Sequence, residues 1–546
     1  MLVSYLQRTG GLRKLQPVAL SRWQQRTLKT QRTLKTRGTN PKKADKEEEK
    51  KPPHKGYFDE LRETISSWQQ STLNTQDTDP KKADGKEEER PPRKGYFEEL
   101  REIMIMPLTS ADPNIPTKRV TAKYCAQKFT APPRNVTMLS SDFIDDSLYN
   151  PAYGYFSKQA LIFSLREGYD FSSFRDSSAF MDVMGDQYKE IERELDDVRG
   201  ITRQLWHTST EIFKPWYGYA IAKHIAEQYM ADRKANVHDD PLVVYEVGGG
   251  NGTLMMNILD YIRNNEPAVY SQMEYRLVEI SPKLARQQLI KHGSNNFVHA
   301  NAKVINQSIL DWSTLESRAC FVVAMELLDN FPHDVVRYDY DTGEPYQGIV
   351  RVYDDSEYED NYEPVTDPTI RSYLAARKQA APEYKTPALP SELHRRLRRQ
   401  LPLAPNMTKI EFIPTHAFRF LQVLGKFFPR HRAVLGDFYM LPDTVPGAVD
   451  APVVQTRLKG TMVPCDTYMV RPGWFDIFFP TNFELLQSMY NATCRAPAST
   501  AAGLGGARVC TQAEFVKQYG DLSKTATRSG ENPMLEFYGN NKFLLS

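Results

Sequence analysis

The sequence predicts an α/β protein built on a doubly wound, mostly parallel sheet. From about residue 241, strand-like apolar runs alternate with helical stretches, which is typical of strand–helix–strand units. A glycine-rich turn directly follows the first of these strands, and acidic residues stand at the ends of several strands. Ligands of such sheets bind at the carboxyl ends of the strands, so we expect the functional site at that edge.

The first 44 residues are strongly basic. They contain eleven lysines or arginines and no acid, with leucines interleaved. This pattern resembles a mitochondrial presequence and predicts localisation in the mitochondrial matrix, while a disordered basic tail is the alternative. The remaining residues carry 59 bases and 68 acids, a net charge of −9, so no basic excess favours nucleic acid as a partner.

Residues 45–102 hold most of a duplicated segment. Asn40–Glu63 returns as Asp79–Glu102 with 17 of 24 positions identical, and lysine, glutamate and proline dominate both copies. Such a composition predicts disorder. Each copy ends in a helix-like stretch, and Phe58, Leu61 and Ile65 would share one face of the first. That face could dock on a partner, although a solvated linker is the simpler interpretation.

The folded part is expected to begin near Ile103. We predict helical N-terminal elements over residues 103–240 and the sheet domain over residues 241–546, with an inserted accessory region around residues 340–405 that is acidic and tyrosine-rich, then basic. The sequence contains no run of 18 apolar residues, so we expect no helix that spans a membrane. The five cysteines lie far apart without a CxxC spacing, which argues against a zinc site or a disulfide framework. Nothing in the sequence indicates the oligomeric state.

The first strand of the domain ends in VVYEVGGGNGT, residues 243–253. A dinucleotide fingerprint would place its third glycine at position 253, which is threonine here. A glycine-rich backbone lets an adenosyl ligand approach the strand end, and the shorter turn suits a ligand without a pyrophosphate. We therefore expect S-adenosylmethionine rather than NAD, with a ligand-free tight turn as the alternative. The residues expected to bind the cofactor are Glu246, Gly248, Gly250 and Gly252.

Two further acids extend the predicted cofactor pocket. Glu279 ends the second strand in LVEIS, where a carboxylate can accept hydrogen bonds from both ribose hydroxyls. Asp311, in SILDW, could meet the adenine amino group. A helix N-cap is an equally good interpretation of Asp311.

The fourth strand ends in AMELLDNFPHD, which places Glu326 and Asp329 three residues apart. If the backbone turns helically there, both carboxylates face one side and can hold a guanidinium or an amine. Holding the acceptor nitrogen in line with the methyl donor would supply most of the catalysis. Alternatively, Asp329 is a cap and Glu326 a surface partner. We expect His333 to be a surface or capping residue, not a base.

Several segments resemble, in order, the motifs of the MidA-like mitochondrial methyltransferases. They are SLYNPAYGYFSK, YEVGGGNGTL, LVEISPKL, AMELLDNFPHDVV, RAVLGDFYML, CDTYMVRPGWFDIFFPTNFELL and MLEFYGNNKFLL, and the resemblance covers roughly residues 134–546. It implies a class I S-adenosylmethionine-dependent methyltransferase fold and a role in respiratory complex I assembly. It also implies a protein partner, with an arginine of a complex I subunit as methyl acceptor. Carried across, Glu279 would hold the ribose, and Glu326 with Asp329 would line the acceptor side.

The sequence also departs from this family. YDF at residues 169–171 and TSTE at residues 208–211, which belong to one compact element in relatives, are separated by 36 residues. Tyr439 stands near Asp437 where the family has glycine. These differences keep a second hypothesis open, a methyltransferase-fold scaffold that no longer transfers methyl groups. Replacing Glu326 with alanine would separate the two, because only an enzyme would lose activity.

Overall fold

The computed structural model describes residues 116–546 except 159, 166, 197–203, 294–298, 355–356, 385–405, 459–460 and 496–504. All described residues belong to one compact unit. The predicted presequence, the duplicated segment, residues 103–115 and part of the expected accessory region lie outside the described residues.

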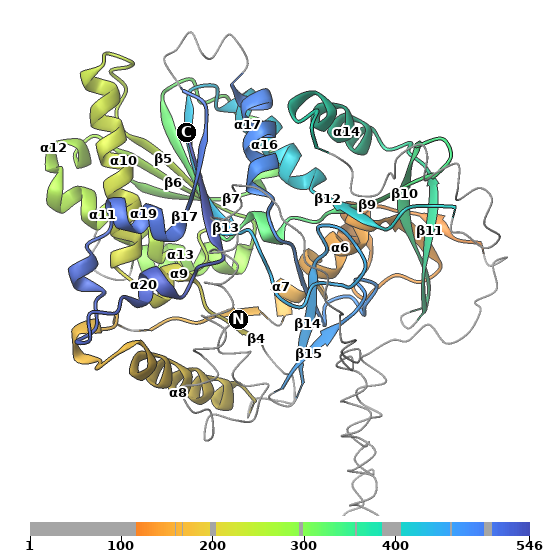
Figure 1. The fold of residues 1–546 in the computed structure, drawn as a ribbon, viewed down its shortest axis with the longest axis horizontal. Helices are drawn as coiled ribbons and strands as arrows, with labels where there is room; N and C mark the ends of the chain where they lie inside the picture. Colours follow the sequence, from red (N-terminus) through yellow and green to blue (C-terminus); the bar gives the residue numbers. More distant parts are fainter. Residues whose placement is uncertain are drawn as a thin grey trace, which may run out of the picture. The chain divides into compact units, whose positions relative to one another are not determined.

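A seven-stranded sheet with the order β17-β18-β13-β8-β5-β6-β7 lies at the centre of this unit (Figure 1). Its strands are β5 (Val243–Val247), β6 (Glu274–Glu279), β7 (Ala302–Asn306), β8 (Cys320–Met325), β13 (His431–Phe438), β17 (Arg508–Thr511) and β18 (Asn541–Leu545). β5, β6, β7, β8 and β13 pair in parallel, whereas β18 is antiparallel to both of its neighbours. The chain runs outward from β5 through β6 to β7 and then returns to β8 on the other side of β5. This order confirms the predicted doubly wound sheet and places its switch point between β5 and β8.

Helices cover both faces of this sheet (Figure 1). One face carries α10 (Trp216–Lys234), α11 (Thr253–Asn265), α13 (Pro282–Gly293) and α19 (Gln512–Tyr519), and the other carries α14 (Pro368–Ala380), α16 (Thr415–Phe427) and α17 (Phe483–Cys494). Successive side chains of a strand point to opposite faces. Val244 accordingly packs in the core under α10 and α11, while Val243 and Tyr245 pack in the core under α16. Every residue of β5 is buried, which explains its continuous apolar sequence.

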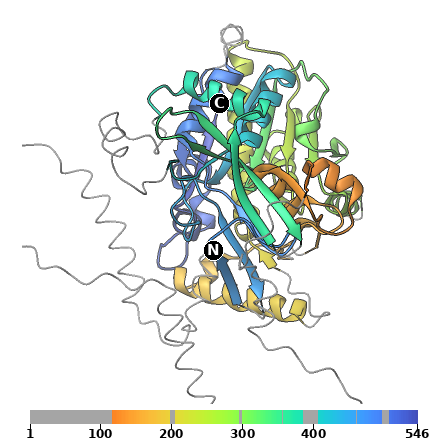
Figure 2. The same cartoon turned by 90° about the vertical axis from the view of Figure 1, so that its right-hand side faces the viewer.

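A second, mixed sheet was not predicted. It contains β1 (Lys118–Arg119), β2 (Val136–Leu139), β9 (Asp334–Tyr338), β10 (Pro345–Asp354), β11 (Glu357–Pro364) and β12 (Glu411–Ile413). Within the region expected to be an insertion, β10 and β11 form an antiparallel hairpin (Figure 2, green). β10 also pairs with β2, from the start of the described chain. The helix that follows β2, α6 (Ser140–Tyr149), packs against this sheet.

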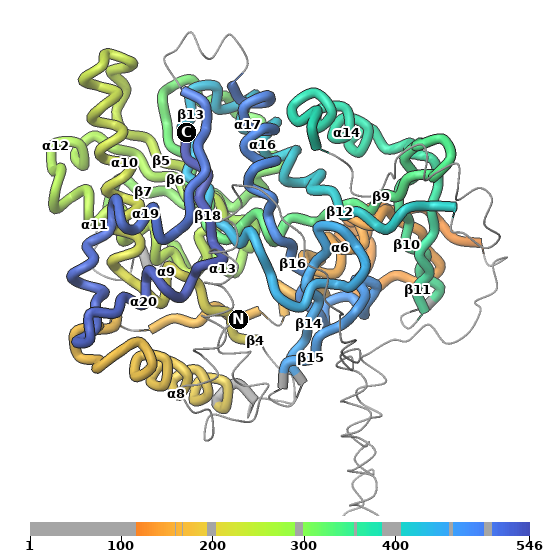
Figure 3. The backbone as a smooth tube through the Cα atoms, viewed as in Figure 1, coloured from red at the N-terminus to blue at the C-terminus, as the bar shows by residue number. Residues whose placement is uncertain are grey.

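The two halves of the split YDF and TSTE element meet again in space. β3 (Ala160–Ile162) and β4 (Gln204–Trp206) pair in parallel. The segment between them, which contains α8 (Ser177–Asp196), therefore begins and ends at neighbouring strands. Phe171 stacks on Phe213 with ring centroids 5.7 Å apart. The side chain of Glu192 on α8 pairs with Arg457 of β14 (Val453–Leu458) at 3.0 Å, and Figure 3 shows α8 running toward β14 and β15 (Thr461–Cys465). The long separation in sequence therefore does not separate the two motifs in the fold.

None of the helices within the described ranges is long and apolar enough to cross a membrane. All five cysteines are free thiols.

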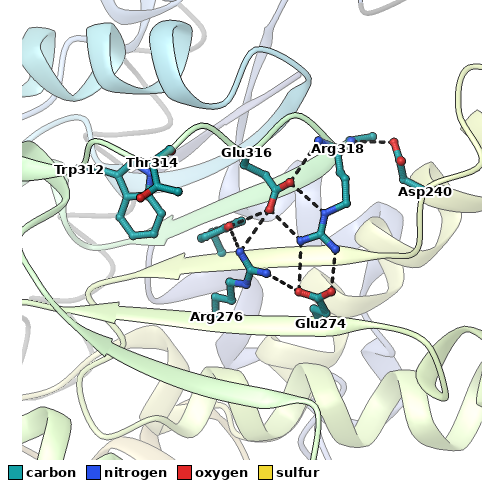
Figure 4. Close-up of polar contacts among 9 residues, drawn as sticks. Asp240, Glu274, Arg276, Trp312, Thr314, Glu316 and Arg318 are labelled. Carbon is teal, nitrogen blue, oxygen red and sulfur yellow. Dashed lines mark hydrogen bonds and ion pairs between the residues drawn. The ribbon is translucent and has the colours of Figure 1, made fainter.

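An ion-pair network ties the amino ends of the strands together, at the edge opposite the glycine turn (Figure 4). Arg318 contacts Glu274 at 2.6 Å and Glu316 at 2.9 Å, and Arg276 contacts Glu316 at 3.3 Å. Burial opposes ionisation of Glu316, but hydrogen bonds from Arg318 and Tyr245 lower its pKa to about 2. The network therefore stabilises the sheet when Glu316 is ionised.

Replacing Arg318 with methionine is expected to lower the free energy of unfolding by about 1–2 kcal/mol at neutral pH, between the ranges typical of exposed and buried pairs. Because the folded state lowers the pKa of Glu316 from 4.5 to about 2, this contribution is present above the unfolded pKa and is lost as pH falls toward 2. Urea unfolding at several pH values measures it. The control is Arg263→Met, whose pair with Asp260 is more exposed, and a loss equal to that of Arg318→Met would contradict the prediction.

Candidate active site

The glycine turn joins β5 to α11 at the switch point of the sheet. Gly248, Gly250 and Gly252 have φ angles of +77°, +50° and +72°, a left-handed region that residues with a Cβ rarely adopt. Gly249 is needed for a different reason, because a Cβ there would lie 2.2 Å from Leu277 of β6. The structure therefore brings the three predicted glycines together as a tight loop packed against the end of β6.

Glu246 lies beneath this loop, within β5. It is buried, and the hydroxyl of Tyr275 donates a 2.6 Å hydrogen bond to its carboxylate. Burial raises the pKa of Glu246 to about 7, although this hydrogen bond opposes the rise. Glu246 thus links β5 to β6 directly under the turn.

Glu279 is fixed at the end of β6, next to the loop, and its side chain is 3% exposed. The backbone N–H of Ser281 donates to Oε1 at 2.8 Å, and Gln288 Nε2 donates to Oε2 at 3.2 Å. Burial raises the pKa of Glu279 above its usual value. The same Gln288 nitrogen donates to the carbonyl of Gly250 at 2.8 Å, so Gln288 connects the glycine loop to the acidic residue.

Gln288 was not predicted, because nothing in the sequence of α13 distinguishes it from its neighbours. Its side chain is 1% exposed, and its Oε1 has no hydrogen-bond partner among the described residues. A buried acceptor without a partner costs free energy unless a ligand or a water satisfies it. The position beside Gly250 and Glu279 makes a ligand hydroxyl a suitable donor.

Asp311 is the last residue of a short 3₁₀ helix, η2 (Ile309–Asp311). The N-cap of that helix is Ser308, so the interpretation of Asp311 as an N-cap is wrong. Its side chain is exposed. The segment is held near Glu279, because the N–H of Gln307 donates to the Glu279 carbonyl at 3.1 Å.

Glu326 and Asp329 follow β8 on the other side of the switch point. Glu326 has a φ of +52°, a strained conformation for a residue with a Cβ and one that is concentrated at functional sites. Its carboxylate accepts a 3.0 Å hydrogen bond from the N–H of Ser209. Asp329 lies in the 3₁₀ helix η3 (Leu328–Asn330) and is 5% exposed. The 3₁₀ helix begins only at Leu328, so Glu326 is not part of the helical turn that we predicted, but its carboxyl lies near enough to Asp329 to raise the pKa of that residue.

Asp437, at the end of β13, takes the capping role that we had considered for Asp329. Its Oδ2 accepts hydrogen bonds from the N–H groups of Leu328 at 2.7 Å and Asp329 at 3.1 Å. Burial, with Asp437 nearby, raises the pKa of Glu326 to about 7, and burial raises the pKa of Asp437 to about 7. Burial and the nearby Asp437 and Glu326 carboxyls raise the pKa of Asp329 well above its usual range. Asp437 could have been identified from the sequence, because it lies at the end of a predicted strand.

The TSTE segment is hydrogen-bonded to the glycine loop. Glu211, in α9 (Ser209–Ile212), accepts hydrogen bonds from Thr253 Oγ1 at 2.7 Å and from Asn251 Nδ2 at 3.1 Å. Lys214 pairs with the same carboxylate at 3.1 Å. Thr253, which breaks the dinucleotide fingerprint, therefore has a structural role here.

We had expected His333 to be a surface or capping residue, but its ring is buried. Its Nδ1 donates a 2.9 Å hydrogen bond to the carbonyl of Phe331, and the ring stacks on Phe479 with centroids 3.8 Å apart. Burial lowers the pKa of His333 to about 3, so the ring is neutral at physiological pH.

Comparison with known proteins places this geometry in context. A family model described as "Putative S-adenosyl-L-methionine-dependent methyltransferase" matches residues 220–500, just over half of the chain. The mitochondrial protein arginine methyltransferase NDUFAF7 homolog of Schizosaccharomyces pombe is 24% identical over 329 residues, which cover 58% of this chain and 66% of the relative, slightly less than two thirds.

Two solved structures of a Burkholderia thailandensis protein also align with the chain. The form bound to S-adenosyl-homocysteine is 15% identical, with a TM-score of 0.44, and the alignment covers 75% of this chain and 88% of that one. The native form is 15% identical, with a TM-score of 0.43, and the corresponding shares are 75% and 87%.

Proposed function

The chain belongs to the family of S-adenosyl-L-methionine-dependent methyltransferases, and from that premise we propose that it is a mitochondrial protein-arginine methyltransferase that acts in respiratory complex I assembly. The observation that carries the proposal is the arrangement of two acidic sites around one switch point. Glu279 and Gln288 lie beside the glycine loop, whereas Glu326 and Asp329 follow the neighbouring strand β8.

The residues of the first site suit an adenosyl ligand. The left-handed glycines add no side chains of their own at the strand end, Glu279 is a fixed hydrogen-bond acceptor, and the free Oε1 of Gln288 is a second one. Ribose hydroxyls are donors that match both acceptors. We propose that Glu246 supports the loop and that Asp311 meets the adenine. When bound, S-adenosylmethionine supplies a methyl group on a positively charged sulfur.

The second site suits a cationic acceptor. Glu326 and Asp329 are close to each other, and within the described ranges no ion pair joins either to a lysine or an arginine. A guanidinium has five N–H donors in a plane and is bound well by paired carboxylates. We propose that these two residues orient the acceptor nitrogen, which is catalysis by positioning.

Three parts of the proposal rest on similarity to other proteins. These are arginine as the methyl acceptor, a role in complex I assembly, and the mitochondrion as the compartment. The fission yeast relative is named a mitochondrial protein arginine methyltransferase, and the motifs from residue 134 onward resemble those of the MidA-like family. The basic first 44 residues support import into the matrix. The scaffold alternative rested partly on the split element, and the contact of Phe171 with Phe213, two residues after TSTE, weakens that part of the argument.

Calorimetric titration of S-adenosylmethionine and of NAD into the full chain tests the cofactor. We expect micromolar binding of the first and none of the second. Incubation with methyl-labelled S-adenosylmethionine and complex I subunits, followed by mass spectrometry, tests the acceptor. Cofactor binding without labelled arginine would favour the scaffold, and failure of a well-folded chain to bind either ligand would overturn the enzyme proposal.

Replacing Gln288 with leucine is expected to weaken binding of S-adenosylmethionine about tenfold, because the variant removes one acceptor and frees Glu279 from the glycine loop. Calorimetry measures the change. The matched control is Gln287→Leu, since Gln287 is exposed on the same helix. Equal affinities for the two variants would show that Gln288 does not position the loop.

A further inference from the structure

Asp476 is a buried carboxylate with an unused acceptor. It begins β16 (Asp476–Phe478), which pairs with β14, and its side chain is 1% exposed. Its Oδ1 has no hydrogen-bond partner among the described residues. A buried carboxylate is costly unless it is neutral or meets a cation, so this oxygen requires an explanation.

The backbone places Asp476 beside the proposed acceptor site. β16 packs against η3, and the N–H of Phe479 donates to the carbonyl of Asp329 at 2.8 Å. From the other side, the hydroxyl of Tyr149 at the end of α6 donates to the carbonyl of Asn330 at 2.8 Å. An aromatic ring and a third carboxylate therefore adjoin Asp329.

Glu326, Asp329, Asp437 and Asp476 form what we term the acid cluster. Each of the first three accepts at least one hydrogen bond, whereas Oδ1 of Asp476 accepts none. No lysine or arginine of the described segments forms an ion pair with any member. Four carboxyls without a cation repel one another when they are ionised. A ligand with positive charge and several N–H groups would satisfy both the free oxygen and the charge.

The pKa values agree with this picture. Burial raises the pKa of Asp476 well above its usual range, and Asp476 in turn contributes to the raised pKa of Asp329. Without a cation the cluster holds protons, and an entering cation would displace at least one of them.

We propose that Asp476 is a further acceptor-binding residue, whose free Oδ1 accepts a hydrogen bond from the guanidinium held by Asp329. The identity of the guanidinium rests on the proposed function. The inference adds a third carboxylate to the predicted pair and makes the site selective for a cation over a neutral group of the same shape.

The test is calorimetric titration of a blocked Gly-Arg-Gly peptide, and of its citrulline counterpart, into the full chain saturated with S-adenosyl-homocysteine. Citrulline has the shape of arginine without the charge. Titration in two buffers of different ionisation enthalpy counts the protons released. We expect the wild type to prefer arginine and to release about one proton. Asp476→Asn should weaken arginine binding at least about tenfold and release fewer protons. The control Asp466→Asn, at an exposed position ten residues earlier in the sequence, should behave like the wild type.

Unchanged affinity and proton release in Asp476→Asn would overturn the inference, as would a wild type that does not distinguish arginine from citrulline. The latter comparison needs no variant, so it stands even if Asp476→Asn fails to fold. Failure of the proposed function is a different result, namely arginine binding with no labelled methyl group transferred.

Discussion

Replacing Glu279 with alanine is expected to weaken binding of S-adenosylmethionine by at least about a hundredfold. The carboxylate is 3% exposed and is held by Ser281 and Gln288, so it can meet ribose hydroxyls without reorganising. Two hydrogen bonds to a charged acceptor contribute about 1.5–3 kcal/mol each, and every 1.4 kcal/mol is about tenfold in affinity. Calorimetric titration of the full-length variant measures the loss.

Two further variants separate this loss from general damage. Glu227→Ala, at an exposed position on α10, should bind the cofactor like the wild type. Glu279→Gln keeps one acceptor and should lose less affinity than alanine. Burial raises the pKa of Glu279, so the ionised form, the better acceptor, gains population as pH rises. Wild-type affinity should therefore increase with pH through this titration while the glutamine variant stays flat. Full affinity in Glu279→Ala would place the ribose elsewhere.

The central sheet could be predicted because its middle strands, β5, β8 and β13, are buried on both faces. Continuous apolar runs such as VVYEV, each followed by a turn and a helix, have few other interpretations. Acids at the ends of parallel strands necessarily meet at one edge of the sheet, which is why Glu279 and Glu326 could be proposed as site residues from position alone.

The second sheet could not be predicted, because the pairings of β2 with β10 and of β9 with β12 are long-range and β11 is polar. Val136 pairs with Val352 across more than 200 residues, a distance over which sequence periodicity carries no information. The acidic stretch of the expected accessory region contains a half-buried strand, β11. Tyr358 packs against Phe143 in the core, while the acids around it stay nearer the surface.

Two residues of the proposed site could not be predicted for a similar reason. Gln288 lies in an ordinary helical pattern, and Asp476 lies 147 residues after Asp329 on a three-residue strand. Gln288 lies outside the motifs, and Asp476 lies within CDTYMVRPGWFDIFFPTNFELL without being singled out there, so each matters because of what folds beside it. The strained backbone of Glu326 is likewise invisible in sequence, since the strain comes from its neighbours.

The acid cluster also leads us to expect specific effects on activity and on its dependence on pH. Replacing Glu326 with glutamine is expected to lower kcat/KM for an arginine peptide by about 10²–10³-fold, the cost typical of removing one polar contact that stabilises the transition state, with little change in the affinity for S-adenosylmethionine. Asp329→Asn should have an effect of the same order. Steady-state methyl transfer, followed by mass spectrometry, measures both.

In the wild type, kcat/KM should rise as pH increases through about 7, because the pKa of Glu326 and that of Asp437 are both raised to about 7 and only the ionised carboxylates attract a guanidinium. Stability should change in the opposite direction. A carboxyl whose folded pKa exceeds its unfolded value stabilises the fold below the unfolded pKa, and this contribution is lost as pH rises through 7. In Glu326→Gln, both the gain of activity and the loss of stability with rising pH should be smaller. A variant that kept wild-type activity and the wild-type pH profile would remove Glu326 from the acceptor site. If the variant loses activity, unchanged cofactor binding would show that the loss is not a loss of the fold.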